Sequence, residues 1–390
     1  MVSYWLAFSW GLVILASMVG WGVAVNRLLF PCHRVDRGQR AAWGLALSVV
    51  VGGVLNLLQR ISRTTVLVYL GLGMVWRLAS WIPRIRELSQ VKGVIQRIAE
   101  VKNRQIFGCG VLLVAPLIMI QYAASITGVQ HGGPLSPTNF NRGDDFHAYF
   151  VFPEKMLQTG SMGPDPFSGR RLESSLGGKS FLDTFVLSVL SVQNLHVLDS
   201  GLGPLIILGL LWGTMQEHGI SLAGSVGMLP VFLLIPAPTG NVTSLYTGLA
   251  LFLSLYRTLN WKELSSSSFI SRLLVTAMLA AAICSLKSNF IPACAFVCSC
   301  SFLCYLIGKS NRRTAAVEVV STGLLVLAFM LPWMISMYQS SGTLLYPLLG
   351  RGYHQSVYGT SLSPYSELTV PRTATLILKH LSEAPSLVLL

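Results

Sequence analysis

Long uninterrupted apolar runs dominate this sequence and restrict the folds that it can adopt. A run of about 18 or more apolar residues is long enough to cross the ~30 Å hydrocarbon core of a bilayer as a helix. Charged residues make up only 11% of the 390-residue chain, against about a quarter in soluble domains, and the mean hydropathy is +0.61. The sequence therefore predicts an all-α polytopic membrane protein with roughly ten transmembrane helices. The predicted spans are 5–29, 41–58, 65–82, 106–127, 202–216, 221–237, 242–256, 271–286, 289–307 and 315–337.

The basic residues lie in short segments between these spans and predict the orientation of the chain. They cluster at residues 27–40, 84–104, 257–272 and 309–313. Cytoplasmic loops attract Lys and Arg, so all four clusters are expected in the cytoplasm. The N-terminus and the segment 128–200 are then expected on the non-cytoplasmic side. These loops account for the net charge of +13, and no nucleic-acid partner is predicted.

The segment 84–102 has the pattern of an amphipathic helix. Its apolar residues recur at intervals of three and four, with basic residues between them. Such a helix is expected to lie on the anionic lipid of the cytoplasmic leaflet. A solvated connecting helix is the alternative.

A long polar segment, 128–179, follows the span 106–127 and is unusual in so apolar a chain. Its beginning is rich in Gly, Pro, Ser and Asn and should be irregular. A short helix is predicted over 144–158, with an acidic first turn that suits the helix dipole. Residues 180–198 are apolar but interrupted by Asp183, too short a run to span comfortably. They are interpreted as a helix lying in the outer membrane interface.

Two adjacent carboxylates, Asp144 and Asp145, are the candidate catalytic groups of this polar segment. A carboxylate can act as a general base that removes a proton from an incoming hydroxyl. The pair also suits a divalent cation, Mg²⁺ or Mn²⁺, which would neutralise a phosphate leaving group. The alternative is a structural one, in which the carboxylates cap the predicted loop helix.

Several basic side chains near the outer ends of the predicted spans suit recognition of a phosphate or a sugar. The alternatives are interaction with anionic lipid, solvation in a loop, or snorkelling of a lysine at the membrane edge. His147 is either a solvated loop residue or a contact to substrate or metal. The other candidates are Arg170, Arg171, Lys179, Lys287 and Arg351.

The order of these features resembles that of the type C (GT-C) integral membrane glycosyltransferases, the broad group related to protein mannosyltransferases and aminoarabinose transferases. In that family a span is followed by a large outer loop with an acidic residue, then by short helices on the membrane and further spans. Asp144 and Asp145, followed by Tyr149, Pro153 and Gly160, resemble the pattern of the first loop. The stretch 342–348, with Tyr-Pro at 346–347, resembles a later segment of many bacterial members.

The resemblance implies a sugar donor linked to polyprenyl phosphate and used on the non-cytoplasmic face, here expected to be that of the bacterial inner membrane. One loop carboxylate, Asp144 or Asp145, would be the base that activates the acceptor, and Tyr149 would belong to the substrate site. In some members a divalent ion assists the phosphate. The sequence departs from the family in placing three predicted spans before the loop-bearing span.

The expected organisation is an N-terminal region at 1–105, a GT-C-like core at 106–337 with the outer loop 128–200, and an outer C-terminal segment at 338–390. The apolar end of the chain indicates that it stops before a further helix or is truncated. The alternative function is a non-enzymatic transporter or flippase, or an inactive GT-C-like membrane subunit. Transporters typically show internal repeats and ionisable residues deep in their helices; the sequence shows no clear repeat, and charged residues inside its predicted spans are scarce.

Overall fold

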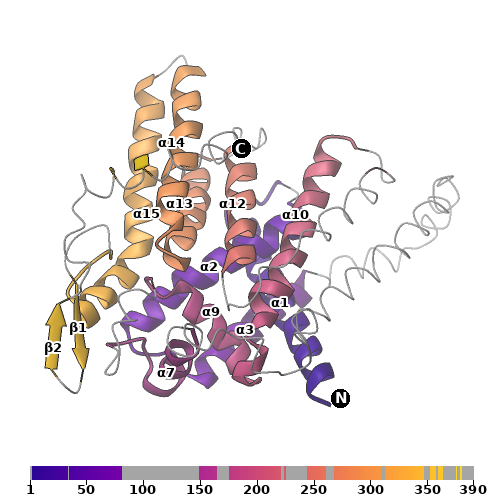
Figure 1. The fold of residues 1–390 in the computed structure, drawn as a ribbon. Coiled ribbons are helices and arrows are strands. Elements are labelled where there is room, and N and C mark those ends of the chain that lie inside the picture. The colour runs from indigo at the N-terminus through magenta and orange to yellow at the C-terminus, as the bar shows by residue number, and fades with distance from the viewer. Residues whose placement is uncertain are drawn as a thin grey trace, which may run out of the picture.

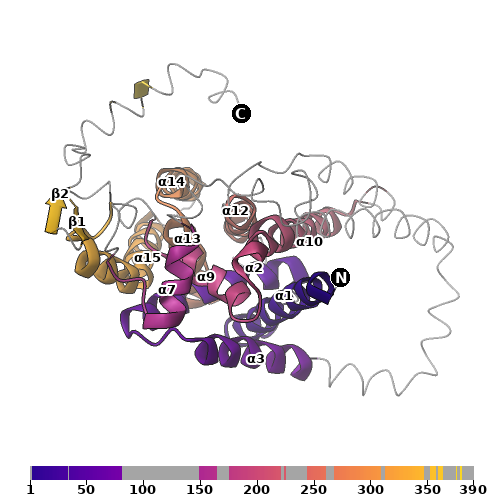
Figure 2. The same cartoon turned by 60° about the horizontal axis from the view of Figure 1, so that its bottom comes forward.

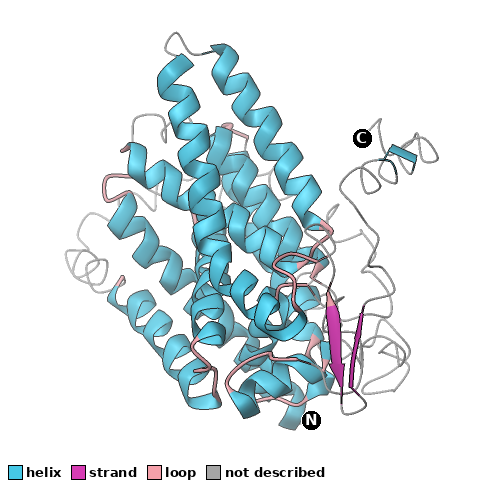
Figure 3. Cartoon of the chain, turned by 90° about the vertical axis from the view of Figure 1, so that its left-hand side faces the viewer, coloured by secondary structure: helices cyan, strands magenta, loops and turns pink. Residues whose placement is uncertain are grey.

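A computed structural model gives the fold of the chain. It describes residues 2–33, 35–80, 149–164, 175–220, 224, 244–260, 268–308, 312–346, 352–356, 359–362, 375 and 378–379. Nearly all of the elements in these ranges are helices (Figures 1 and 3). An antiparallel hairpin of β1 (Tyr353–Ser356) and β2 (Gly359–Leu362) is the sheet among them. It lies within the expected outer C-terminal segment.

Six helices of the described residues are long and apolar enough to cross a membrane, so the expected helical membrane protein is confirmed. They are α1 (Val2–Leu29), α2 (Arg37–Leu57), η6 with α10 (Val197–Leu202, Gly203–Glu217), α13 (Phe269–Leu286), α14 (Phe290–Gly308) and α15 (Arg312–Ser341). The count of ten is not confirmed. Helices α3 (Arg63–Ala79) and α12 (Leu245–Asn260) have only 17 and 16 residues. The predicted spans 106–127 and 221–237, the latter apart from residue 224, lie outside the described residues, as does the predicted amphipathic helix 84–102.

Helix α2 lies in the middle of the bundle and packs against helices from both halves of the chain (Figures 1 and 2). Glycines let α1 and α2 approach until their backbones touch. A Cβ atom added to Gly22 would lie 1.7 Å from the Arg40 carbonyl oxygen, and one added to Gly44 would lie 1.8 Å from the Met18 oxygen. Close approach at small residues is the usual way in which helices associate in lipid, where no hydrophobic effect drives them together.

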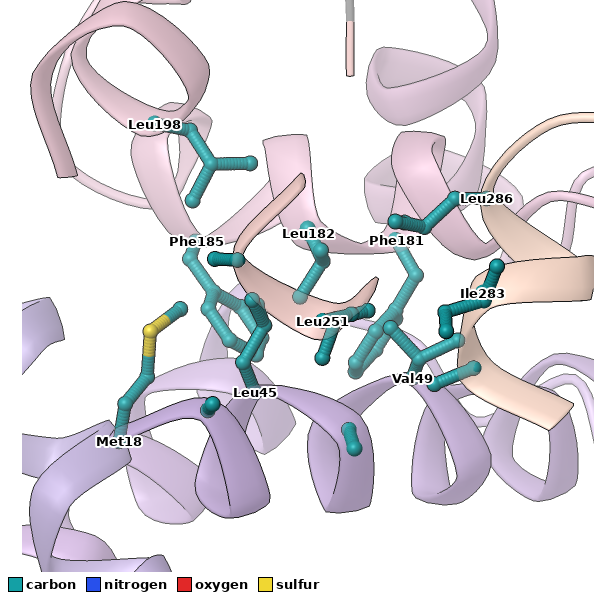
Figure 4. Packing of buried hydrophobic residues seen from close by; sticks show 14 of the residues in the cluster. Met18, Leu45, Val49, Phe181, Leu182, Phe185, Leu198, Leu251, Ile283 and Leu286 are labelled. Carbon is teal, nitrogen blue, oxygen red and sulfur yellow. The ribbon is translucent and has the colours of Figure 1, made fainter. Parts of the chain in front are cut away.

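A short buried helix, α9 (Gly178–Leu187), packs on α2 and completes the core. All ten of its residues are buried. Figure 4 shows Phe181 and Phe185 above α2, near Leu45 and Val49, and the two phenyl rings meet edge to face with centroids 5.2 Å apart. Side chains from α13 and from the segment before α10 close the cluster, namely Ile283, Leu286 and Leu198. Helix α9 is therefore part of the protein interior.

Polar contacts hold the described helices together at both ends of the bundle. At one end, Arg257 near the end of α12 pairs with Asp36 before α2, at 2.8 Å, and with Glu217 at the end of α10, at 2.6 Å. At the other end the backbone N–H of Ile61, after α2, donates to the oxygen of Gly160 at 3.1 Å. Helix α7 (Val151–Thr159), α9 and the hairpin lie at this second end, the lower one in Figure 1.

Two sequence expectations about the polar segment need adjustment. The short helix predicted over 144–158 is α7, which begins at Val151 and ends at Thr159, where Gly160 takes a left-handed conformation with φ +87°. The helix predicted over 180–198 ends at Leu187, and its position in the outer interface stays a prediction. This segment is α9, which is enclosed by protein, with Phe181 and Phe185 packed in the core cluster.

Replacing Gly44 by alanine tests the close contact between α1 and α2. The added methyl group meets the Met18 backbone, so we expect Gly44→Ala to lower the stability by about 1–3 kcal/mol. Gly71→Ala is the control, since a Cβ there meets nothing within 4 Å. Thermal unfolding of the detergent-solubilised proteins measures both, and equal melting temperatures would contradict the packing.

Candidate functional site

The site predicted from sequence is only partly covered by the described residues. Tyr149, Lys179 and Lys287 lie within them. The remaining predicted residues lie outside, namely Asp144, Asp145, His147, Arg170, Arg171 and Arg351. The three described residues come from separate parts of the chain, and all lie at the end of the bundle that holds α7 and α9.

The centre of this site is an ion pair between Lys179 and Asp183. The two residues are one helical turn apart in α9, so their side chains lie on one face. The Lys179 ammonium contacts the Asp183 carboxylate, and the residues are only 6% and 1% exposed. The ammonium also lies over the ring of Tyr149, 4.8 Å from the ring centroid, a distance at which a cation is attracted to an aromatic face.

Helix α7 brings Tyr149 to this position. Phe150 and Phe152 are buried in the core cluster, and α7 packs directly on α9. After α7 the chain is held to the end of α2, where the backbone N–H of Met162 donates to Asn56 Oδ1 at 2.7 Å. The Asn56 amide also donates to Ser336 of α15 at 2.7 Å. Tyr149 is thus placed by the contacts of the segment that follows it, and it lies four residues after Asp145 in the sequence.

The start of α9 is fitted tightly against the end of α13. Gly177 has φ +125°, a conformation that only glycine adopts readily, and a Cβ there would lie 2.6 Å from the Trp333 ring. A Cβ on Gly178 would lie 2.8 Å from the oxygen of Ser285. The backbone N–H of Ser288 donates to Ser175 Oγ at 3.0 Å. The segment around Lys287 therefore lies beside the start of α9.

An apolar groove begins near this segment and follows the helices. It has a volume of about 740 Å³ and lies between α13, α14 and α15. Ile291 and Leu345 line it near the end that holds Lys287, and Phe302 and Val319 line it farther along. Only 6% of the apolar stretch Phe290–Ile307 of α14 is buried inside the protein. The groove is thus open along a helix that the protein itself hardly covers.

The geometry favours a positioning role for Lys179. Its ammonium lies inside the protein against a carboxylate, so an approaching phosphate would also meet the negative charge of Asp183. The lysine stands in the first turn of α9, where the helix dipole disfavours a cation, and Asp183 offsets that effect. Binding of phosphate by Lys179 stays a prediction. The contact that the structure gives Lys179 beyond its ion pair is with the Tyr149 ring, which the ammonium holds in place.

Sequence reasoning missed three polar residues that organise this end of the bundle. Asp183 was interpreted only as an interruption of an apolar run, although its spacing of four from Lys179 is the signal of a helical ion pair. Asn56, in α2, joins the segment after α7 to α15. Asp199 accepts hydrogen bonds from the backbone N–H groups of Leu245 and Thr247, at 3.0 and 2.8 Å. It thereby caps the start of α12, a structural role.

No group of three or more His, Cys, Asp or Glu side chains that could hold a metal ion occurs within the described ranges. Metal binding by Asp144 and Asp145 therefore stays a prediction. Comparison with known proteins found no matching family model, no matching curated protein and no matching solved structure.

Breaking the buried ion pair tests its contribution to the site. Lys179→Met removes the ammonium but leaves the carboxylate of Asp183 buried, so we expect a loss of about 3–5 kcal/mol. The double variant Lys179→Met/Asp183→Leu removes both charges and is expected to recover most of that loss. Thermal unfolding measures both. A Lys179→Met protein that melts like the parent would contradict the buried pair.

Proposed function

We propose that the protein is a membrane glycosyltransferase that uses a sugar linked to polyprenyl phosphate. The observation that carries the proposal is the placement of Tyr149, close to Asp144 and Asp145 in sequence, over the buried Lys179–Asp183 pair. Such an arrangement needs a loop of defined structure at the membrane surface. A loop that only connects two spans has no need of buried charges, which are costly unless they are paired.

The apolar groove supports a lipid-linked donor. Polyprenyl chains are long and apolar, and a groove between α13, α14 and α15 would hold one while keeping it in the plane of the lipid. The groove reaches Ile291, four residues beyond Lys287. In this proposal Lys287 meets the phosphate of the donor as its lipid chain enters the groove. The sugar then lies at the end of the bundle occupied by α7 and α9.

The proposed reaction is a displacement at the anomeric carbon of the sugar. A carboxylate, Asp144 or Asp145, accepts the proton of the acceptor hydroxyl. The acceptor oxygen forms a bond to the anomeric carbon, the bond from that carbon to the phosphate oxygen breaks, and polyprenyl phosphate leaves with the electron pair. Lys287 stabilises the negative charge of the departing phosphate. Tyr149, fixed by Lys179, contacts the sugar.

The orientation of the chain supports a reaction on the non-cytoplasmic face. Of the described basic residues near helix ends, Arg60 and Arg63 lie at the end that holds α7 and α9, whereas a larger group lies at the opposite end, among them Arg27, Arg37, Arg257 and Arg272. The positive-inside tendency assigns their end to the cytoplasm. Polyprenyl-linked donors would then be used on the other face.

Replacing both loop carboxylates tests the proposed base. Asp144→Asn/Asp145→Asn is expected to lower the release of polyprenyl phosphate by at least about 100-fold, the contribution typical of a general base. The assay uses membrane vesicles and a panel of labelled polyprenyl-phosphate hexoses and pentoses. Glu154→Gln is the control, since Glu154 is an exposed carboxylate of α7. Full activity in the double variant would exclude this mechanism, and a parent inactive on the whole panel would favour the transporter or inactive-subunit alternative.

A reporter fused near Gly143 tests the orientation on its own. We expect it to lie on the non-cytoplasmic side, and a reporter fused near Ser310, between α14 and α15, to lie in the cytoplasm. Labelling of single cysteines by a membrane-impermeant reagent in intact cells gives the same information without a fusion. A cytoplasmic signal at Gly143 would overturn both the orientation and the use of a donor on the outer face.

A further inference from the structure

A second site lies at the opposite end of the bundle, far from α9 in the fold. A cavity of about 1010 Å³ opens between the end of α1, the start of α2, the end of α3 and the middle of α10. These helices pack on one another (Figure 2). The volume is at the upper end of the range for small-molecule sites. The cavity belongs to the end that carries the basic clusters, and the proposed glycosyl transfer makes no use of it.

The cavity is lined by an excess of positive charge. Four arginines from three helices line it, and Asp36 is the acidic side chain among its described lining residues; the arginines are Arg27, Arg37, Arg40 and Arg77. The Asp36 carboxylate is already engaged, because it accepts from Arg257 Nη2 at 2.8 Å and from the backbone N–H of Gln39 at 2.9 Å. It therefore offsets little of the charge of Arg27 and Arg37, the two exposed arginines of the cavity.

A buried amide in the same cavity points to a ligand with hydrogen-bonding groups. Asn26 lines the cavity and is only 7% exposed. Its Oδ1 atom has no hydrogen-bond partner among the described residues. A buried acceptor left unpaired is costly, and native proteins usually satisfy it. A donor such as a hydroxyl group of a bound molecule would satisfy Asn26 while the arginines meet an anion.

The remaining wall favours a ligand that is partly apolar. Val23, Val35 and Trp212 line the cavity beside the arginines. Tryptophan is enriched where membrane meets water, and basic pockets between helices on the cytoplasmic side suit the head groups of anionic lipids. Topology signals alone need only basic residues in the loops. They do not require arginines from three helices to line one cavity with a buried amide.

We propose that this cavity binds a phosphate group that carries a hydroxyl-bearing substituent, as in the head group of phosphatidylglycerol. The arginines contact the phosphate through charge-assisted hydrogen bonds. A hydroxyl of the substituent donates to Asn26 Oδ1, and the apolar wall contacts the first carbons of the acyl chains. Soluble phosphate shares the anionic chemistry but lacks the hydroxyl and the acyl chains, so the two sources can be separated by experiment.

The test measures lipid binding to the full-length protein in nanodiscs and by native mass spectrometry. Phosphatidylglycerol is compared with phosphatidylcholine, and inorganic phosphate is added alone. We expect Arg27→Gln/Arg37→Gln to weaken phosphatidylglycerol binding by about tenfold or more, since each arginine near a charged lipid contributes measurably to binding. Both side chains are exposed, so the fold should tolerate the change, and the melting temperature checks this.

Matched variants separate a built site from general attraction between charges. Arg60→Gln/Arg63→Gln removes the same charge from exposed positions at the other end of the bundle and should leave binding within about twofold of the parent. Asn26→Leu keeps every charge and should still weaken phosphatidylglycerol binding. Equal losses in the two arginine pairs, or unchanged binding in Arg27→Gln/Arg37→Gln, would overturn the proposal. Stabilisation by inorganic phosphate as strong as that by the lipid would also overturn it, by assigning the site to a soluble anion.

Discussion

The scarcity of hydrogen-bonding partners inside a bilayer is the constraint on which the rest of this structure depends. Backbone groups in lipid must be satisfied within helices, and polar side chains are costly unless they are paired. The described chain follows this rule by collecting its ion pairs near the ends of helices. Arg257 joins α12 to α2 and α10 at one end, and Lys179 pairs with Asp183 at the other. The two candidate sites, the Tyr149–Lys179–Asp183 site and the basic cavity, lie at these two ends of the bundle.

Helix α2 connects the two ends physically. Its first turn begins beside Asp36, in the wall of the basic cavity, and Asn56 near its last turn holds the segment after α7 and contacts α15. Between these ends the helix is fitted to α1 through glycines and to α9 through Phe181. Helix α2 thus contributes residues to both ends of the bundle.

Sequence reasoning found what depends on local composition and missed what depends on packing. The apolar runs predicted a helical membrane protein, and the position of Lys287 between two spans agrees with the structure. The burial of α9 was missed, because a short apolar run looks alike whether lipid or protein covers it. The basic cavity was missed since Arg27, Arg37 and Arg77 lie in separate segments, and no periodicity indicates that three helix ends meet.

The cost of the Lys179–Asp183 pair is the strongest physical reason to assign α9 more than a structural role. Well-packed apolar residues in place of a buried ion pair are often as stable or more stable, and α9 already packs Phe181, Leu182 and Phe185 into the core. A leucine and a methionine would therefore serve the core at least as well. What they would not provide is a cation under the Tyr149 ring. The pair is best explained by the position that it gives to the Tyr149 ring.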